Sequence, residues 1–234
     1  MNNARDLSAA RPPEGATAPS GGSAAGAAAQ RGGHDLLRIG VFGGAFDPPH
    51  NAHVALARAA VEQLRLDRLL VFPTGQAWHK ARALSAGARR VEMAALAFAD
   101  VPRVQIDARE VHRDGPTYTI DTLRELRGEL PGARLLLVIG ADQAEALHTW
   151  KDSFDIARIA VLSIAARARP VSDAPPADIS HLPPGFYQPI DLPSMSVSST
   201  AIRARVAAGQ PIDDLVPAAV ARYIAEHHLY QQPT

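Results

Sequence analysis

The sequence predicts an α/β fold, a doubly wound parallel sheet of five or six strands with C-terminal helices. From Leu36 onward, short apolar runs alternate with segments of helical periodicity, which is the pattern of βαβ units. The 234 residues, 47% of them hydrophobic, are enough to build one domain around a single core. Ligands of such sheets gather at the carboxyl ends of the strands, so we expect functional residues in the loops that follow strands.

The expected strands are short and apolar, and helices separate them. We expect strands over residues 36–42, 69–72, 104–107, 135–139 and 160–165. We expect helices over residues 50–64, 85–99, 119–130, 198–208 and 217–227. Ser85 is the expected N-cap of the second helix, and Gly209 the expected C-terminal cap of the fourth. The Pro-rich stretch 170–185 predicts a loop.

Residues 1–34 differ in composition from the rest of the chain. They consist mainly of Ala, Gly, Ser and Pro with scattered Arg, and have almost no large apolar side chains. Such a segment cannot offset its own ordering entropy. We therefore expect a disordered N-terminal tail, followed by a single domain over residues 35–234. The tail lacks the hydrophobic core of a signal peptide and fits a transit peptide only weakly.

Charge and cysteine content limit the kinds of ligand and partner that the sequence predicts for this protein. Lys plus Arg and Asp plus Glu both number 24, so no net field attracts nucleic acid or an anionic membrane. No apolar run approaches the roughly 18 residues of a membrane span. The absence of Cys excludes disulfides, thiolate metal sites and cysteine nucleophiles, and is compatible with a reducing cytoplasm. We expect a cytoplasmic protein with a small-molecule partner, and the sequence leaves the oligomeric state open.

Two glycines followed by two histidines form the first candidate site. Gly43 and Gly44 follow a strand and precede a helix, where their backbone N–H groups can bind a phosphate. His50 and His53 lie on one face at the start of that helix and can donate hydrogen bonds to a polyphosphate. Taken singly, these residues also fit an ordinary turn and partly buried structural histidines. The segment has neither the Walker A nor the dinucleotide-binding fingerprint. A zinc site at His50 and His53 would need a third ligand, which the sequence does not supply, so we predict no metal site in the protein.

A second candidate site lies about 150 residues further along the chain. Ser198, Ser199 and Thr200 cluster their hydroxyls at the start of an expected helix, and Arg203 follows one turn later. Alone, this pattern fits a helix cap with a surface arginine. Together with the first segment it predicts one phosphate site built from two distant parts of the chain.

Both segments resemble the adenylyltransferase branch of the nucleotidyltransferase superfamily. Residues 43–53 are similar to its Gly-x-Phe-Asp-Pro-x-His-x-Gly-His signature, with Ala52 where the family usually has Gly. Residues 196–203 are similar to its Ile-Ser-Ser-Thr-x-Ile-Arg motif, with Val197 for Ile. The resemblance implies a Rossmann-like nucleotidyltransferase fold. It also implies transfer of AMP from ATP to a phosphorylated small molecule, with Mg²⁺ bound to the triphosphate.

The resemblance also implies roles for individual residues. His50 and His53 would contact the α-phosphate and bridging oxygens, and Arg203 would hold the leaving pyrophosphate, which makes these three the catalytic residues. The implied ATP-binding residues are Gly43, Gly44, Ala45, Phe46, His50, His53, Gly140, Asp142, Ser198, Ser199, Thr200 and Arg203.

Further segments are similar to bacterial nicotinate-nucleotide adenylyltransferases. This resemblance extends from about Arg38 to the C-terminus. The segments are a His-Lys loop at 73–80, a Ser-Tyr-Thr-like element at 117–119, Ile-Gly-x-Asp at 139–142, Thr-Trp at 149–150 and Arg-Pro at 169–170. The implied substrate-binding residues are Lys80, Tyr118, Thr119, Trp150 and Arg169. The implied reaction in NAD biosynthesis joins ATP and nicotinate mononucleotide into nicotinate adenine dinucleotide and pyrophosphate.

Several alternatives stay open on the residues alone. Asp142 also fits a helix cap, Trp150 a core residue and Lys80 a solvated charge. A phosphopantetheine enzyme would be shorter and usually has Thr at the position of His50, and a cytidylyltransferase lacks the Trp150 and Thr-Tyr-Thr elements. Glycerol phosphate and nicotinamide mononucleotide are further possible acceptors, and a non-catalytic adenine-nucleotide sensor is the competing class. The sequence does not decide between the acid and the amide of the pyridine nucleotide.

Overall fold

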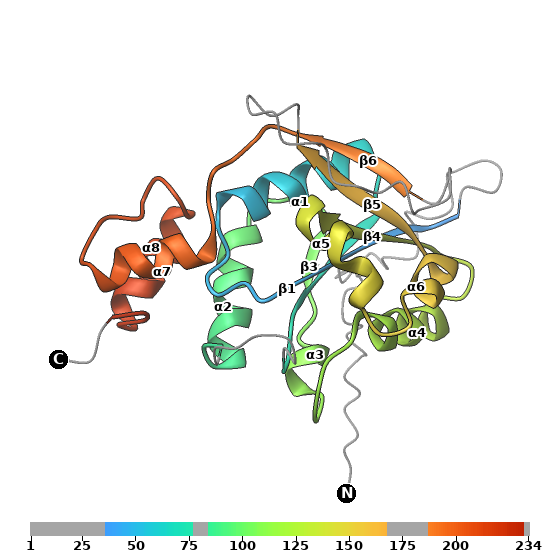
Figure 1. Cartoon of the computed structure of the whole chain (residues 1–234), viewed down its shortest axis with the longest axis horizontal. Helices are drawn as coiled ribbons and strands as arrows, with labels where there is room; N and C mark the ends of the chain where they lie inside the picture. Colours follow the sequence, from blue (N-terminus) through green and yellow to red (C-terminus); the bar gives the residue numbers. More distant parts are fainter. Residues whose placement is uncertain (1–35, 77–83, 168–186, 232–234) are drawn as a thin grey trace, which may run out of the picture. The chain divides into compact units, whose positions relative to one another are not determined.

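The computed structural model describes residues 36–76, 84–167 and 187–231 (Figure 1). These residues contain one sheet of six parallel strands in the order β3-β2-β1-β4-β5-β6. The strands are β1 (Arg38–Gly44), β2 (Arg68–Pro73), β3 (Val104–Ile106), β4 (Arg134–Gly140), β5 (Ala160–Arg167) and β6 (Tyr187–Leu192). The predicted doubly wound parallel sheet is confirmed.

Helices follow most of the strands. They are α1 (Asn51–Gln63), α2 (Gly87–Phe98), α3 (Arg109–His112), α4 (Thr119–Glu129), α5 (Ala141–Glu145), the 3₁₀ helix η2 (Ala146–Thr149), α6 (Ser153–Ile159), α7 (Ser199–Ala207) and α8 (Ala218–Glu226). None of the helices in the described part of the chain is long and apolar enough to cross a membrane.

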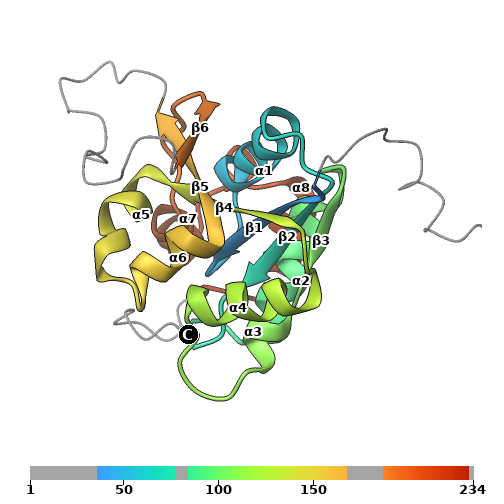
Figure 2. The same cartoon turned by 90° about the vertical axis from the view of Figure 1, so that its right-hand side faces the viewer.

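The sheet is buried on both faces, and each face has its own hydrophobic core. Successive side chains of a strand point to opposite faces. In β4, Leu136 and Val138 therefore join the core formed with α1, α2, α7 and α8, whereas Leu135, Leu137 and Ile139 join the core formed with α4, α5 and α6. Figure 2 shows α1, α2 and α8 on one side of the sheet and α4, α5 and α6 on the other. This double burial explains why the strands read as nearly continuous apolar runs in the sequence.

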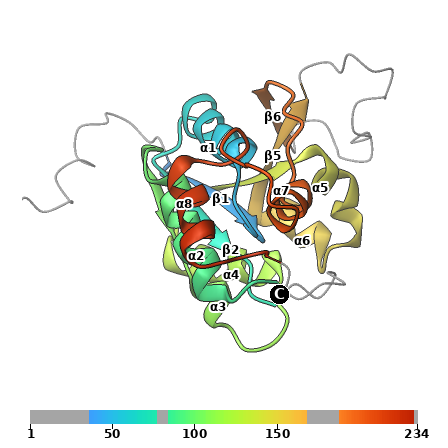
Figure 3. The same ribbon diagram turned by 90° about the vertical axis from the view of Figure 1, so that its left-hand side faces the viewer.

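The strand order places a crevice at the carboxyl ends of β1 and β4. After β1 the chain winds outward through β2 to β3, then returns to form β4 on the other side of β1. The helices that follow β1 and β4 therefore depart toward opposite faces, which leaves a gap where ligands of such sheets bind. The C-terminal helices α7 and α8 lie on the side toward which β1 ends (Figures 1 and 3).

Some local predictions are wrong or incomplete. Ser85 is not the N-cap of α2, because that helix begins at Gly87 with Ala86 as its cap. The Ser85 backbone N–H instead donates to Oδ2 of Asp47 at 3.2 Å. Strand β6 and the short helices α3, α5, η2 and α6 have no counterpart among the predicted ranges. The predicted tail at 1–34 and the predicted loop at 170–185 lie outside the described residues.

Candidate active site

A cavity of about 730 Å³ opens at the carboxyl end of the sheet. Its walls come from the loop after β1, the start of α1, the end of β4, the segment after β6 and the start of α7. Ten of the twelve predicted ATP-binding residues line it, namely Gly43, Gly44, Ala45, Phe46, His50, His53, Gly140, Asp142, Ser198 and Ser199. Two sequence segments about 150 residues apart thus contribute to one cavity.

The loop after β1 is shaped by Phe46. This residue has a left-handed backbone (φ 47°) and a buried side chain that meets the rings of Phe42 and Phe98 edge-on at 5.4 and 5.6 Å. A Cβ on Gly44 would lie 2.8 Å from the Phe46 ring, whereas a Cβ on Gly43 would meet nothing within 4 Å. Gly44 is therefore required for packing against the Phe46 ring.

His50 and His53 stack on each other at the start of α1. Their ring centroids are 3.7 Å apart with an angle of 21° between the planes. His50 is the N-cap residue in an extended conformation, and its backbone N–H donates to Nδ1 of His53 at 3.2 Å. Since Nδ1 of His53 accepts this hydrogen bond, the neutral ring carries its proton on Nε2. The structure thus places an N–H donor of defined tautomer at the cavity.

His50 is buried, with 7% of its surface exposed, and its Nδ1 has no hydrogen-bond partner among the described residues. Burial lowers the pKa of His50 to about 4. The ring is therefore neutral at pH 7, and it can offer a hydrogen-bond donor without a positive charge.

This burial predicts an unusual titration for His50. We expect its imidazole resonances in two-dimensional NMR to stay those of a neutral ring from pH 8 down to about pH 5, with a midpoint near 4. The unfolded chain binds that proton near the ordinary value of about 6.5, so the free energy of unfolding falls as the pH drops from about 6.5 toward 4. A midpoint near 6.5 in the folded protein would contradict the assignment.

The second motif is tied directly to the loop after β1. The Ser198 hydroxyl caps α7 by accepting from the Ala201 N–H at 3.2 Å. The Ser199 hydroxyl donates to the Pro48 carbonyl at 2.9 Å. Nη1 of Arg203 donates to the Asp47 carbonyl at 2.8 Å. These contacts span 151 and 156 residues of sequence, so the start of α7 holds the loop that leads to His50.

Thr200 and Arg203 differ in placement from the other predicted ATP-binding residues. Neither lines the cavity, and Nη2 of Arg203 donates to the Thr200 hydroxyl at 3.1 Å.

The predicted substrate residues divide between described and undescribed parts of the chain. Tyr118 is the N-cap residue of α4, Thr119 is the first residue of that helix, and Trp150 is the C-cap residue of η2. Tyr118 and Trp150 pack on the same hydrophobic core beside β4, outside the residues that line the cavity. Lys80 and Arg169 lie outside the described residues.

The loop after β2 and the segment before α4 contact each other closely. The Thr117 backbone N–H donates to the Gln76 carbonyl at 3.2 Å, which joins the loop after β2 to the segment before α4. A Cβ on Gly75 would lie 2.1 Å from the Glu110 carbonyl oxygen and 2.5 Å from the Thr117 hydroxyl. Only glycine fits there, because α3 and the segment before α4 both pass within contact distance of its backbone.

Comparison with known proteins identifies the family. The cytidylyltransferase-like family model matches residues 41–205. A probable nicotinate-nucleotide adenylyltransferase from Albidiferax ferrireducens is 50% identical over 196 residues, which cover 84% of this chain and 99% of that protein. One from Chromobacterium violaceum is 41% identical over 213 residues, covering 83% and 99%. This chain belongs to the nicotinate-nucleotide adenylyltransferase family.

Solved structures of this kind share the fold at low sequence identity. The nicotinic acid mononucleotide adenylyltransferase of Plasmodium falciparum, in its complex with NaAD, superimposes with a TM-score of 0.69 at 19% identity, covering 82% of this chain and 97% of that one. The same protein complexed with APC gives a TM-score of 0.68 at 19% identity, covering 83% and 97%.

Arg90 supports the loop after β1 of this adenylyltransferase, although it does not line the cavity and was not among the predicted site residues. It lies on α2 with 3% of its surface exposed. Its Nε donates to the Ser85 carbonyl at 2.9 Å, and its Nη1 donates to the carbonyls of Ala45 and Thr74 at 3.0 and 2.7 Å. Burial holds the pKa of Arg90 below its usual value, although the nearby Asp47 carboxylate opposes this effect. Arg90 thus fastens the loop after β1 to the loop after β2.

The segment after β6 is the other missed part of the site in this family member. Residues 192–197 line the cavity from the end of β6 to the Ser198 cap of α7. Ser196 and Val197 belong to the predicted second motif, whereas Pro193, Ser194 and Met195 were not predicted because strand β6 was not expected. The signal that could have found them is their place immediately before the second motif.

Proposed function

We propose that this chain transfers AMP from ATP to nicotinate mononucleotide, giving nicotinate adenine dinucleotide and pyrophosphate. The observation that carries the proposal is the meeting of the two motifs at one cavity, where Ser199 and Arg203 bond the loop that leads to His50. The names of the relatives at 50% and 41% identity support the acceptor, and so does the NaAD bound by the structural neighbour.

The reaction is an in-line displacement at phosphorus. A phosphate oxygen of the mononucleotide forms a bond to the α-phosphorus of ATP, and the bond from that phosphorus to the bridging oxygen of pyrophosphate breaks. No protein nucleophile is needed, so the protein positions the reactants and stabilises developing negative charge. We assign this role to Nε2–H of His53 and to the ring of His50, which stacks on it at 3.7 Å.

The pyrophosphate end of the site lies at the start of α7. Backbone N–H groups at a helix N-terminus favour anions, and Ser198 and Ser199 bring this helix end to the cavity. We propose that Arg203 contributes its charge here, with its guanidinium anchored on the Asp47 carbonyl.

Magnesium enters this proposal with ATP. Among the residues that the structure describes, no group of three or more His, Asp or Glu side chains could hold a metal ion. This donor set fits an ion coordinated mainly by phosphate oxygens and water, as is usual for Mg²⁺ with nucleotides. The ion would neutralise charge on the departing pyrophosphate. Asp142 is a carboxylate that lines the cavity, and we propose that it binds this ion through water or binds a ribose hydroxyl.

We place the pyridine nucleotide on the side of α4 and η2. Thr119 starts α4, whose first backbone N–H groups offer donors for the nicotinate carboxylate, and Trp150 offers a ring for stacking on the pyridine. Lys80 and Arg169 are proposed to bind the acceptor's phosphate. We further propose that residues 35–234 form the catalytic domain with 1–34 as an appended tail, and that the enzyme is cytoplasmic.

Pyrophosphate release tests the proposal. Purified protein with ATP and Mg²⁺ is assayed against nicotinate mononucleotide, nicotinamide mononucleotide and phosphopantetheine, and with CTP against glycerol phosphate. We expect the highest kcat/KM with nicotinate mononucleotide. A higher value with the amide would refute the acid preference, and release with none of the acceptors would refute the enzyme assignment in favour of a nucleotide sensor.

A further inference from the structure

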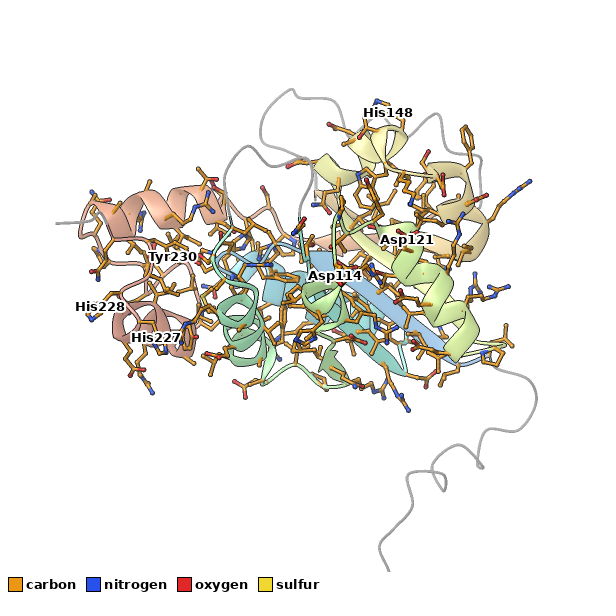
Figure 4. The ribbon with its side chains drawn as sticks, turned by 90° about the horizontal axis from the view of Figure 1, so that it is seen from below. Asp114, Asp121, His148, His227, His228 and Tyr230 are labelled. Carbon is orange, nitrogen blue, oxygen red and sulfur yellow. The ribbon has the colours of Figure 1, made fainter. Side chains whose placement is uncertain are left out.

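Tyr230 lies a few residues beyond α8, in a backbone turn that returns the chain toward the sheet. His228 and Tyr230 both have left-handed backbones, with φ of 50° and 63°, which residues other than glycine rarely adopt. The Leu229 N–H donates to the Ile224 carbonyl at 3.0 Å and fixes this turn. Figure 4 shows Tyr230 on the side of the C-terminal segment nearer the sheet, with His227 and His228 farther out. The turn therefore directs the Tyr230 side chain inward.

The Tyr230 hydroxyl ends on the loop after β1. It donates to Oδ1 of Asp47 at 2.7 Å across 183 residues of sequence. Asp47 has 1% of its surface exposed, and its Oδ2 accepts from the Ser85 N–H at 3.2 Å. Burial and the adjoining Asp47 carboxylate raise the pKa of Tyr230 well above its usual range, so the hydroxyl remains a donor at any physiological pH.

Asp47 links this contact to the reacting groups. Its own carbonyl accepts from Arg203, and the next carbonyl, that of Pro48, accepts from Ser199. Three residues after Asp47 comes His50, the N-cap of α1. Tyr230 itself does not line the cavity, and its hydrogen bond to Asp47 is the contact that connects its hydroxyl to this loop.

We propose that Tyr230 is a positioning residue for AMP transfer, because its hydroxyl fixes the Asp47 carboxylate and thereby the loop that carries His50 and the anchor of Arg203. The proposal rests on the function assigned above to that loop. We expect an Asp47 carboxylate that loses this donor to shift its position beside Arg90, whose pKa it raises. Because Arg203 is anchored on the carbonyl of the same residue, such a shift also displaces the anchor of Arg203.

The test is Tyr230→Phe, which removes one oxygen and keeps the ring that packs on the core beside Met93. We expect kcat to fall about tenfold, the scale of one lost hydrogen bond to a charged group, with less than a threefold change in the KM for ATP. Tyr223→Phe is the matched control, because Tyr223 also donates to a carboxylate, that of Glu92, from the C-terminal helix, away from the loop. Its kcat should equal that of the wild type.

Two further measurements separate positioning from general stability. Hydrogen exchange of peptides covering 43–51 should quicken in Tyr230→Phe and not in Tyr223→Phe. In an Asp47→Asn background, Tyr230→Phe should have little further effect on kcat, since the residue acts through that carboxylate. Unchanged exchange of the loop would overturn the inference even if the wild type proves inactive, and so would equal losses of kcat in the two tyrosine variants. Inactive wild type would refute only the proposed function.

Discussion

Replacing His53 by asparagine is expected to lower kcat by about a hundredfold or more, the usual cost of one transition-state hydrogen bond of this kind. The ring is held by its Nδ1, which accepts from the His50 backbone N–H at 3.2 Å. The asparagine oxygen occupies the position of Nδ1 and can keep that contact, while no atom replaces Nε2–H. The loop geometry therefore survives and the donor to the α-phosphate is lost. Steady-state pyrophosphate release measures kcat and the KM for ATP separately.

The glutamine variant at the same position provides the reciprocal comparison. His53→Gln places an amide N–H near the position of Nε2, and we expect it to recover at least part of the turnover lost in His53→Asn. The KM for ATP should change little in either, because the contact strengthens mainly in the transition state. His112→Ala, at an exposed position of α3, controls for loss of an imidazole and should match the wild type. Wild-type turnover in His53→Asn would show that His53 has no such role.

The strands could be predicted from the sequence where both of their faces are buried. Strands such as β4, apolar on both faces, stand out as runs between polar helical segments. Strand β6 could not be recognised in this way, because it lies at the sheet edge and contains Pro189. An edge strand tolerates a proline, but in a sequence a proline indicates a break in the strand. Helices α3 and α5 have four and five residues, too few to show a 3.6-residue period.

The site could be predicted where its residues are contiguous. The two motifs are short segments whose function depends on local spacing, and eight of their expected ATP-binding residues line the cavity, joined by Gly140 and Asp142 from the segment after β4. Asp47, Ser85, Arg90 and Tyr230 form one polar cluster only through the tertiary fold, and no local pattern connects them. Arg90 did carry a signal, since it shares the buried face of α2 with Met93, Ala94 and Ala97.

Replacing Arg90 by methionine is expected to reduce the free energy of unfolding by about 3–5 kcal/mol, the usual effect of removing one member of a buried charged network. The change leaves the carbonyls of Ala45, Thr74 and Ser85 without their donor inside the protein. It also removes positive charge from beside the buried Asp47 carboxylate. Methionine fills similar volume, so the loss is of hydrogen bonds and charge more than of packing. Urea denaturation of the wild type and the variant measures the difference in the free energy of unfolding.

Arg58→Met on the exposed side of α1 is the matched control, and we expect it to stay within about 0.5 kcal/mol of the wild type. Arg90→Lys should fall between the two, because an ammonium keeps the charge but cannot spread donors over three carbonyls as a planar guanidinium does. If the methionine variant were as stable as Arg58→Met, the buried guanidinium would not hold the two loops together. Activity in the surviving folded fraction would then also be expected to match the wild type, since the loop after β1 would keep its position without Arg90.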